Sequence, residues 1–395
     1  MHDLGQIKCA GAPNRAQFNL QEERVMKKIA VVLIIAALMI PCLGISSDKG
    51  TKDKAMNLID SGLKWLSTQQ EKDGSFRHNV GITGLAITAF LKRPGGPPAE
   101  YKSVIQKGLD YILKHQNEDG SIYDKSSEMP LPNYETSIAV MALAASGDPK
   151  YKKIIAKAQK WLAQSQLDEG EGISPDDPRY GGIGYGASAA RSGTRRGDMS
   201  NLSFAVQALK ESGFPKDDPL WGKVVKFIER CQNYSETNDQ PWAGNDGGFV
   251  YAPDGESKAG KDANGKPRSY ASMTYAGLLS FIYANVDKND PRVQAAVRWI
   301  KQHYTLDENT PLGKQGLFYN YHTMAKALTA YGERVIEDYK GIKHDWYAEM
   351  VDKFASLQKP GGFWVNEADR WMESDPVLVT AYVILALDTG FSILM

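Results

Sequence analysis

A repeated pattern of residues runs through most of this 395-residue chain. Each copy has an aromatic residue, a glutamine four or five positions later, and then a turn that contains glycine. The aromatic positions are Trp65, Tyr111, Trp161, Phe227, Trp299 and Phe354. The glutamines are Gln70, Gln116, Gln166, Gln232 and Gln358, with Tyr304 in the fifth copy, and the glycines are Gly74, Gly120, Gly182, Gly248, Gly316 and Gly362. Such self-similarity indicates a repeat architecture, in which each unit is one supersecondary element.

Each glycine turn leads into a second segment of different character, such as "YETSIAVMALAASG" or "VLVTAYVILALDTG". These segments are rich in alanine and apolar on more than one face, which is typical of a buried helix. The first segments mix Lys, Glu and Gln with one apolar stripe, as solvent-facing helices do. Glycine closes several second segments, at Gly147, Gly213, Gly332 and Gly390, as is common at helix C-termini. The unit is therefore an outer helix, a turn and an inner helix, repeated six times.

A single helix pair cannot bury its apolar faces, so neighbouring units must stack. Six pairs can close into an α/α toroid, with an inner ring of six parallel helices inside an outer ring. An open solenoid is the alternative, because periodicity does not decide whether the ring closes. We expect an all-α fold with one toroid domain over residues 55–395.

The first 54 residues have a different composition. "MKKIAVVLIIAALMIPCLGISS" begins at Met26 with two lysines and an apolar run too short for most membrane spans. This pattern predicts a signal peptide over 26–47, after an over-extended start at 1–25 and before a linker at 48–54. We expect cleavage after Gly44 or Ser47 and an exported protein, with a lipid on Cys42 or a retained signal anchor as the alternatives. Cys231 is then the one cysteine of the mature chain, which excludes an internal disulfide.

The charges of the chain balance, with 47 basic and 47 acidic residues. No global field favours nucleic acid, so we expect no nucleic-acid partner. We expect the protein to be a monomer.

The aromatic–glutamine–glycine repeat resembles the QW repeat of squalene–hopene cyclases and of prenyltransferase β-subunits. The resemblance covers Ala55 to Met395 and implies an α/α toroid with a central cavity, in a divergent exported bacterial member. It also implies an isoprenoid or other apolar ligand. The same toroid serves in complement-type thioester domains and polysaccharide lyases, so function must be argued from the site.

The chemistry of the cyclases is not supported by the expected motif. Class II terpene cyclases protonate an alkene with an aspartate of a D-x-D-D motif, and this sequence contains none. The nearest fragments, Asp176–Asp177 and Asp217–Asp218, lie beside prolines and are typical of turns. Glu373 and Asp375 lie at an inner-helix entrance, where Asp375 is expected to cap the helix or to act as a divergent acid.

The zinc site of the prenyltransferases is also incomplete. The resemblance implies a histidine in a "YHT" context, present at His322, together with an Asp-x-Cys pair on the preceding inner helix. Arg268 and Tyr270 occupy those two positions, and neither side chain replaces the missing ligands. The Cys-Gly-Glu-Gln motif of the thioester proteins is absent as well. We therefore expect no metal and no cofactor, and we interpret His322 as a cavity-rim residue that is hydrogen-bonded among tyrosines or acts as an acid or base.

Polar and aromatic residues remain clustered at the predicted inner-helix N-termini. They are Arg195, Arg196, Asp198, Ser200 and Asn201 in the third unit, Arg268, Tyr270 and Tyr275 in the fourth, Tyr319, Tyr321 and His322 in the fifth, and Arg370, Trp371, Glu373 and Asp375 in the sixth. In a closed ring these ends share one rim of the cavity, and positive helix ends would favour an anionic group there. His322, Asp375 and Asp198 are the acid–base candidates. The alternative is that these residues cap helices, tie loops together and fill a core. Glu135 has a similar position but stands alone.

Three functions are compatible with these features. The first is an exported binding protein that holds a ligand or partner at the cavity rim, which the loss of the family motifs favours. The second is a terpenoid cyclase-like isomerase or lyase with a divergent general acid. The third is an enzyme that acts on a glycan, with Trp242, Tyr251, Trp364 and Trp371 stacking on sugar rings.

Overall fold

The computed structural model describes residues 48–186 and 196–395. The chain divides into two compact units, Met1–Asp53 and Lys54–Met395. Of the first unit only residues 48–53 are described, and they are helical. The predicted signal peptide over 26–47, including Cys42, lies outside the described residues.

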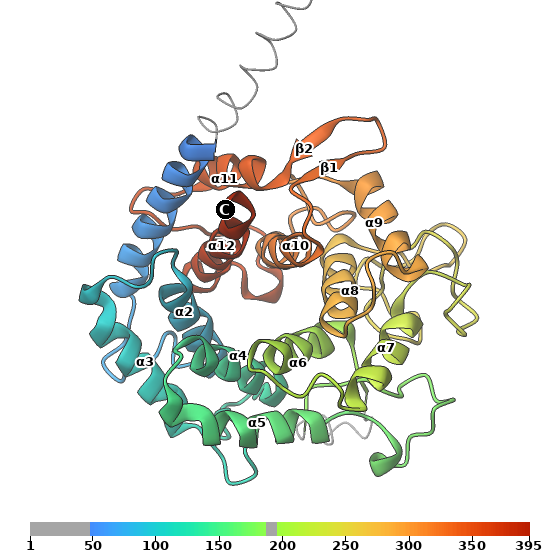
Figure 1. Cartoon of the computed structure of the whole chain (residues 1–395), viewed down its shortest axis with the longest axis horizontal. Helices are drawn as coiled ribbons and strands as arrows, with labels where there is room; N and C mark the ends of the chain where they lie inside the picture. The colour runs from blue at the N-terminus through green and yellow to red at the C-terminus, as the bar shows by residue number, and fades with distance from the viewer. Residues whose placement is uncertain (1–47, 187–195) are drawn as a thin grey trace, which may run out of the picture. The chain divides into compact units, whose positions relative to one another are not determined.

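The second unit contains two sets of helices that alternate along the chain (Figure 1). The outer helices are a segment over 54–67, α3 (Lys102–Lys114), α5 (Lys152–Gln164), α7 (Leu220–Cys231), α9 (Pro291–His303) and α11 (Trp346–Leu357). The inner helices are α2 (Val80–Lys92), α4 (Pro132–Ala145), α6 (Met199–Glu211), α8 (Ala271–Tyr283), α10 (Leu317–Tyr331) and α12 (Pro376–Phe391). A short antiparallel hairpin, β1 (Val335–Glu337) and β2 (Lys343–Asp345), connects α10 to α11. The predicted all-α toroid of six helix pairs is confirmed.

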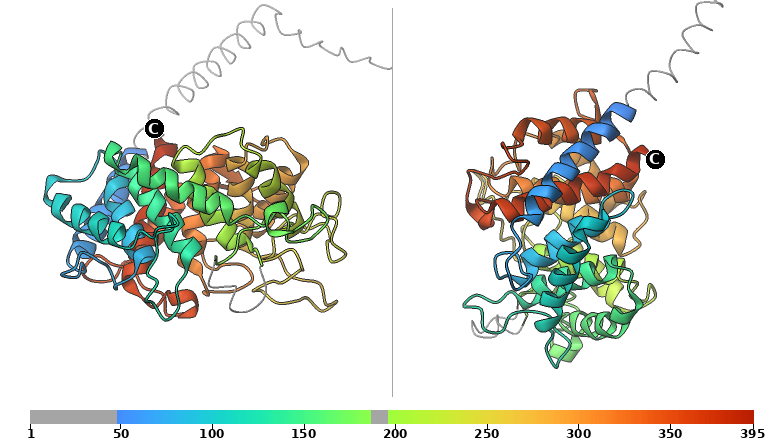
Figure 2. Two further views of the ribbon diagram at one scale, coloured as in Figure 1. Left: turned by 90° about the horizontal axis from the view of Figure 1, so that it is seen from below. Right: turned by 90° about the vertical axis from the view of Figure 1, so that its left-hand side faces the viewer.

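The inner helices are buried on nearly all sides, as their composition predicts. Each one packs against its two neighbours, in the order α2, α4, α6, α8, α10, α12 and back to α2. Within 48–186 and 196–395, one helix is long and apolar enough to cross a membrane, Pro376–Leu394, and 72% of its apolar window is buried in the structure. This helix contains α12, a member of the inner ring (Figure 1), and Figure 2 marks the C-terminal end of the chain that follows it.

The sixth helix pair meets the first, which closes the ring. The side chain of Gln358 donates to the hydroxyl of Ser61 at 2.8 Å. The rings of Trp65 and Phe363 stack with centroids 4.8 Å apart. Arg77 pairs with Asp375 at 3.0 Å. The open solenoid is therefore excluded.

The repeat glutamine joins consecutive units. Gln70 donates to the carbonyl of Gly74 in its own turn at 2.9 Å and to that of Val104 in the next outer helix at 2.8 Å. Gln232 makes the same pair of bonds, to Gly247 and Arg292, at 3.0 and 2.8 Å. One amide therefore fixes the turn and docks it on the following unit, which explains why glutamine recurs in the repeat.

The glycines of the turn are required by close backbone approach. Gly247 has a φ of +84°, and a Cβ there would lie 2.4 Å from the carbonyl oxygen of Ala295. At the next residue, Gly248, a Cβ would lie 2.7 Å from the ring of the repeat aromatic Trp299. In this unit the left-handed residue precedes the glycine of the repeat pattern, whereas Gly74, Gly120 and Gly362 are themselves left-handed. Five of the six turns pack directly on a neighbouring outer helix, where no side chain fits, and in the fifth turn Gly316 packs on Trp371.

Gly247→Ala is expected to lower the free energy of unfolding by about 2–5 kcal/mol, because it adds a clash to an unfavourable φ. Gly213→Ala is the matched control, since Gly213 has a φ of +79° with nothing within 4 Å of its Cβ position. That control is expected to lose about 1–2 kcal/mol, the conformational part alone. Urea unfolding of both variants checks the difference. Equal losses would contradict the role assigned to the close approach.

Three inner helices are tied together near their C-terminal ends by ion pairs among buried and half-buried side chains. Glu211 of α6 accepts from Lys92 of α2 and from Lys326 of α10, each at 2.6 Å. These helices are alternate members of the ring, so the bridge spans its interior. The two lysines hold the pKa of Glu211 down at about 2 against the opposing effect of burial. We call Lys92, Glu211 and Lys326 the axial clamp.

Candidate functional site

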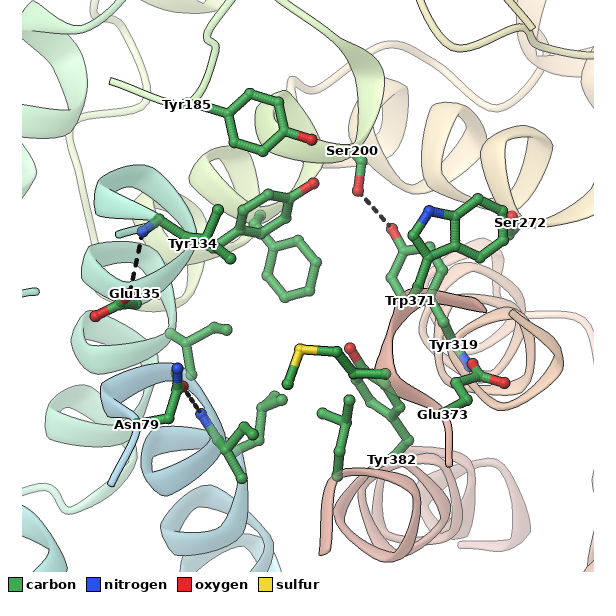
Figure 3. A pocket seen from close by; sticks show the side chains of 18 of the residues that line it. Asn79, Tyr134, Glu135, Tyr185, Ser200, Ser272, Tyr319, Trp371, Glu373 and Tyr382 are labelled. Atoms are coloured by element: carbon green, nitrogen blue, oxygen red, sulfur yellow. Dashed lines mark hydrogen bonds between the residues drawn. The ribbon is translucent and has the colours of Figure 1, made fainter. Parts of the chain in front are cut away.

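A cavity of about 410 Å³ opens among the N-terminal turns of the inner helices (Figure 3). All six inner helices or the residues just before them contribute to its wall, as the predicted shared rim requires. The lining residues are Asn79, Gly81, Ile82, Leu85, Leu131, Tyr134, Glu135, Ile138, Tyr185, Ser200, Phe204, Tyr251, Lys258, Tyr270, Ser272, Met273, Tyr319, Trp371, Met372, Glu373, Leu378 and Tyr382. The axial clamp lies at the opposite ends of these helices.

One side of the cavity carries a group of hydroxyls, which we call the hydroxyl cluster: Tyr134, Tyr185, Ser200, Tyr251 and Tyr319. The hydroxyl oxygens of Tyr185 and Tyr251 are 3.0 Å apart, and those of Ser200 and Tyr319 are 3.4 Å apart. Figure 3 shows the oxygens of Tyr134, Tyr185, Ser200 and Tyr319 directed toward the same part of the cavity. Burial raises the pKa of all four tyrosines, so they stay protonated at neutral pH.

Other parts of the wall are apolar. Ile82 and Leu85 of α2, Ile138 of α4 and Leu378 of α12 form what we call the apolar wall, and all four are at least nine-tenths buried. Since α12, α2 and α4 are consecutive in the ring, these four side chains lie on one side of the cavity. The cavity is therefore amphipathic across its width.

Asp198 lies behind the hydroxyl cluster, 2% exposed, at the N-cap of α6. Its carboxylate accepts from the backbone N–H of Asn201 at 2.9 Å and from the side-chain amide of Asn201 at 2.8 Å. The amide of Asn133 on α4 holds Asn201 in turn, at 2.9 Å from its side-chain oxygen. Burial raises the pKa of Asp198 to about 6, although the hydrogen bonds from Asn201 and the hydroxyl of Tyr251 oppose the shift. A buried acid of this kind, linked through Tyr251 and Tyr185 to the cavity, has the protonation behaviour of a general acid or base.

Because the pKa of Asp198 is raised in the folded protein, we expect the free energy of unfolding to decrease as the pH rises. The native state holds the proton more tightly than the unfolded chain, so the free energy of unfolding falls as pH rises from about 4 to above 6. A shift from 3.8 to about 6 corresponds to about 3 kcal/mol. Asp198→Asn retains a capping oxygen and removes the titration. Urea titrations at pH 4 and pH 7.5 give the unfolding free energies of the wild type and of Asp198→Asn. The difference between the two proteins is expected to change by about 3 kcal/mol between these pH values. A difference that stays constant would contradict the raised pKa of Asp198.

Two glutamates line the cavity but are engaged with backbone. Glu135 accepts from the N–H groups of Leu131 and Asp124, each at 3.1 Å. Glu373 accepts from the N–H groups of Phe318 and Tyr319 at the start of α10, at 3.2 and 2.8 Å. Burial raises the pKa of both carboxyls, and these hydrogen bonds oppose the shift.

The mouth of the cavity is bordered by an exposed apolar pair. Trp371 is 42% exposed and Met372 is 53% exposed, and both have positive φ, +61° and +66°. The guanidinium of Arg370 stacks over the ring of Trp371 at 4.2 Å and donates to Gln315. The ring also packs over Gly316, where a Cβ would lie 2.7 Å from it.

The structure places several predicted rim residues away from the cavity surface. Arg195 lies outside the described residues. Arg196 pairs with Asp254 and Glu256, and Arg268 is exposed on a loop. Asn201 does not line the cavity and lies behind it, hydrogen-bonded to Asp198. Tyr270, Tyr319, Trp371 and Glu373 line the cavity, as does Ser200.

The other acid–base candidates are occupied elsewhere. His322 is 4% exposed inside α10, stacks on Tyr382 at 5.4 Å, and its Nδ1 has no hydrogen-bond partner among the described residues. Burial and then Lys326 lower its pKa well below the usual value, so it is neutral. Asp375 caps α12 and pairs with Arg77. Tyr321 donates to the carbonyl of Leu306 in the core, and Tyr275 is buried outside the cavity wall.

The aromatic residues proposed for sugar stacking do not form one surface. Trp364 is fully buried, and its indole N–H donates to Phe354. The indole N–H of Trp242 donates to Pro253, and this residue does not line the cavity. Tyr251 and Trp371 line it.

The sequence analysis missed part of the site. Tyr134 begins an inner helix beside Glu135, so the position at a helix N-terminus that singled out Tyr319 could have found Tyr134 as well. Tyr185 and Lys258 come from the long loops of the third and fourth units, which carry no periodic signal. In the described parts of the chain, no group of three His, Cys, Asp or Glu residues is placed to hold a metal ion.

Comparison with known proteins identifies the fold. No family model matches the sequence. The type II terpene cyclase MstE from Scytonema, in a variant bound to its product merosterolic acid A, is similar with a TM-score of 0.56 and 11% identity, over 87% of this chain and 99% of that one. An inactive variant of the α-1,6-mannanase GH76A of Salegentibacter sp. HEL1_6, bound to α-1,6-mannotriose, has a TM-score of 0.55 and 9% identity, over 86% and 99%. At these identities the likeness shows an α/α toroid and nothing of the reaction.

Proposed function

We propose that this protein binds an apolar ligand of the isoprenoid type in the cavity at the N-terminal ends of its inner helices. The amphipathic cavity carries this proposal, because its volume falls in the range of small-molecule sites, about 300–1,000 Å³. The apolar wall, together with Phe204, Met273 and the tyrosine rings, offers an environment that favours hydrocarbon over water.

A glycan ligand has less support. A sugar presents hydroxyls on most of its edge, and those facing Ile82, Leu85, Ile138 and Leu378 would lose their hydrogen bonds to water without replacement. The Trp364 and Trp242 rings are not available to stack in this cavity.

A second candidate function is acid–base catalysis on the bound ligand, as in an isomerase or lyase. Asp198 favours it, because a carboxyl with a pKa of about 6 exchanges its proton readily near neutrality and hydrogen-bonds to Tyr251. Catalysis would be supported if the wild type converts a bound ligand and Asp198→Asn still binds that ligand but does not convert it.

Blocking the cavity is expected to abolish ligand binding. Leu85→Trp adds bulk at the apolar wall and is expected to weaken binding of farnesol by about tenfold or more. Ile342→Trp is the control, since Ile342 is exposed on the turn between β1 and β2. Binding is measured by intrinsic fluorescence, and organic extracts of freshly purified protein are analysed by mass spectrometry. If the wild type carries no lipid and binds no isoprenoid, the proposed function is wrong.

Export through the segment 26–47 is part of the proposal. N-terminal sequencing of the native protein is expected to begin after Gly44 or Ser47. A native chain that retains the apolar segment would contradict cleavage and favour an anchor.

A further inference from the structure

We propose that the ligand is an amphiphile with one uncharged oxygen group, an alcohol or a carbonyl, which binds at the hydroxyl cluster while its hydrocarbon part contacts the apolar wall. This inference rests on the proposed function and specifies the chemistry of the ligand.

The hydroxyls of the cluster bond mainly to one another, and each can accept a further bond. A hydroxyl donates one proton and can accept two bonds. Tyr251 hydrogen-bonds to Asp198, and its oxygen is 3.0 Å from that of Tyr185. The oxygens of Ser200 and Tyr319 are 3.4 Å apart, which is long for a bond between hydroxyls. An oxygen atom that approaches this pair from the cavity offers both groups a shorter partner.

The position of the cluster fixes the place of the ligand oxygen. The five side chains come from five different segments: Tyr134 from α4, Ser200 from α6, Tyr319 from α10, Tyr185 from the loop after α5 and Tyr251 from the loop after α7. The first four nevertheless direct their oxygens to one part of the cavity (Figure 3). Tyrosines at a purely apolar site have no need to converge in this way, and each buried hydroxyl gains from a partner.

The charges around the cavity favour a neutral head group. Among the described residues of the lining, Lys258 is the only lysine or arginine. Its Nζ pairs with Glu256 and lies 4.0 Å from the centre of the Tyr251 ring. The carboxyls of Glu135 and Glu373 line the same cavity, and Asp198 lies behind it. The described lining therefore offers a diphosphate too few cations to balance its charge, and burying an unbalanced charge is strongly unfavourable.

The apolar wall accounts for the rest of the ligand. The apolar wall comes from α2, α12 and, through Ile138, from α4, whereas the hydroxyl cluster is drawn from α4, α6, α10 and two loops. On α4, which contributes to both, Ile138 lies about one turn after Tyr134. A ligand that reaches both must therefore be polar at one end and hydrocarbon along the remainder. The axial clamp ties the far ends of α2, α6 and α10, so the rim beside Trp371 and Met372 is the expected entrance.

A matched ligand series tests this inference. Farnesol, farnesyl diphosphate and farnesene share one hydrocarbon chain and differ in the head group, and geranylgeraniol extends the chain. We expect the wild type to bind farnesol about 5- to 10-fold more tightly than farnesene, the gain of about one hydrogen bond, and at least about tenfold more tightly than the diphosphate. The double variant Tyr185→Phe/Tyr319→Phe is expected to bind farnesol only as well as farnesene.

The controls separate a lost head-group contact from misfolding. The affinity for farnesene in the double variant is expected to equal that of the wild type, which reports an intact cavity. Tyr101→Phe, outside the cavity wall, is expected to keep the full preference for farnesol. If the double variant does not fold, the order of affinities in the wild type decides by itself.

Two outcomes overturn the inference and leave the proposed function standing. One is diphosphate binding as tight as that of the alcohol, and the other is equal binding of farnesol and farnesene by the wild type. Failure of every isoprenoid to bind would overturn the proposed function as well.

Discussion

The structure depends on the docking of turns against the next outer helix. A repeat glutamine such as Gln70 or Gln232 bonds its own turn and the following unit with one amide, and the glycine beside it lets the two backbones meet. The sixth unit contacts the first in a similar way, since both Gln358 and Gly362 meet Ser61, and this contact closes the ring.

Closure of the ring creates the site. Six inner helices that begin at the same rim bring residues far apart in the chain to one cavity, among them Tyr134, Ser200 and Tyr319. The hydrophobic surroundings that stabilise these helices also change the chemistry of the groups among them, because burial penalises charge. Asp198 becomes a weaker acid, and His322 becomes a neutral ring packed on Tyr382.

The sequence predicted much of the fold and a smaller part of the site. The helix pairs and the shared rim follow from periodicity, and Tyr270, Tyr319, Trp371 and Glu373 were found because they begin inner helices. Their side-chain directions were not predictable in the same way. Tyr321 follows Tyr319 by two residues, which turns it about 200° around α10 and into the core. His322 lies three residues after Tyr319, nearly one turn deeper in the helix, where it packs on Tyr382. Tyr185 and Lys258 reach the cavity from irregular loops, whose paths no periodic pattern specifies.

By itself, the sequence determined the number of units, the outer or inner character of each helix, and the absence of the D-x-D-D and complete zinc-ligand motifs. These properties are local, because they depend on residue types at fixed spacings along one chain segment. Only the tertiary structure decided that the ring closes, that Asp375 caps a helix and pairs with Arg77, and that Asp198 lies behind a cluster of hydroxyls. Those properties depend on burial and on contacts between distant units, which exist only after the six pairs have packed together.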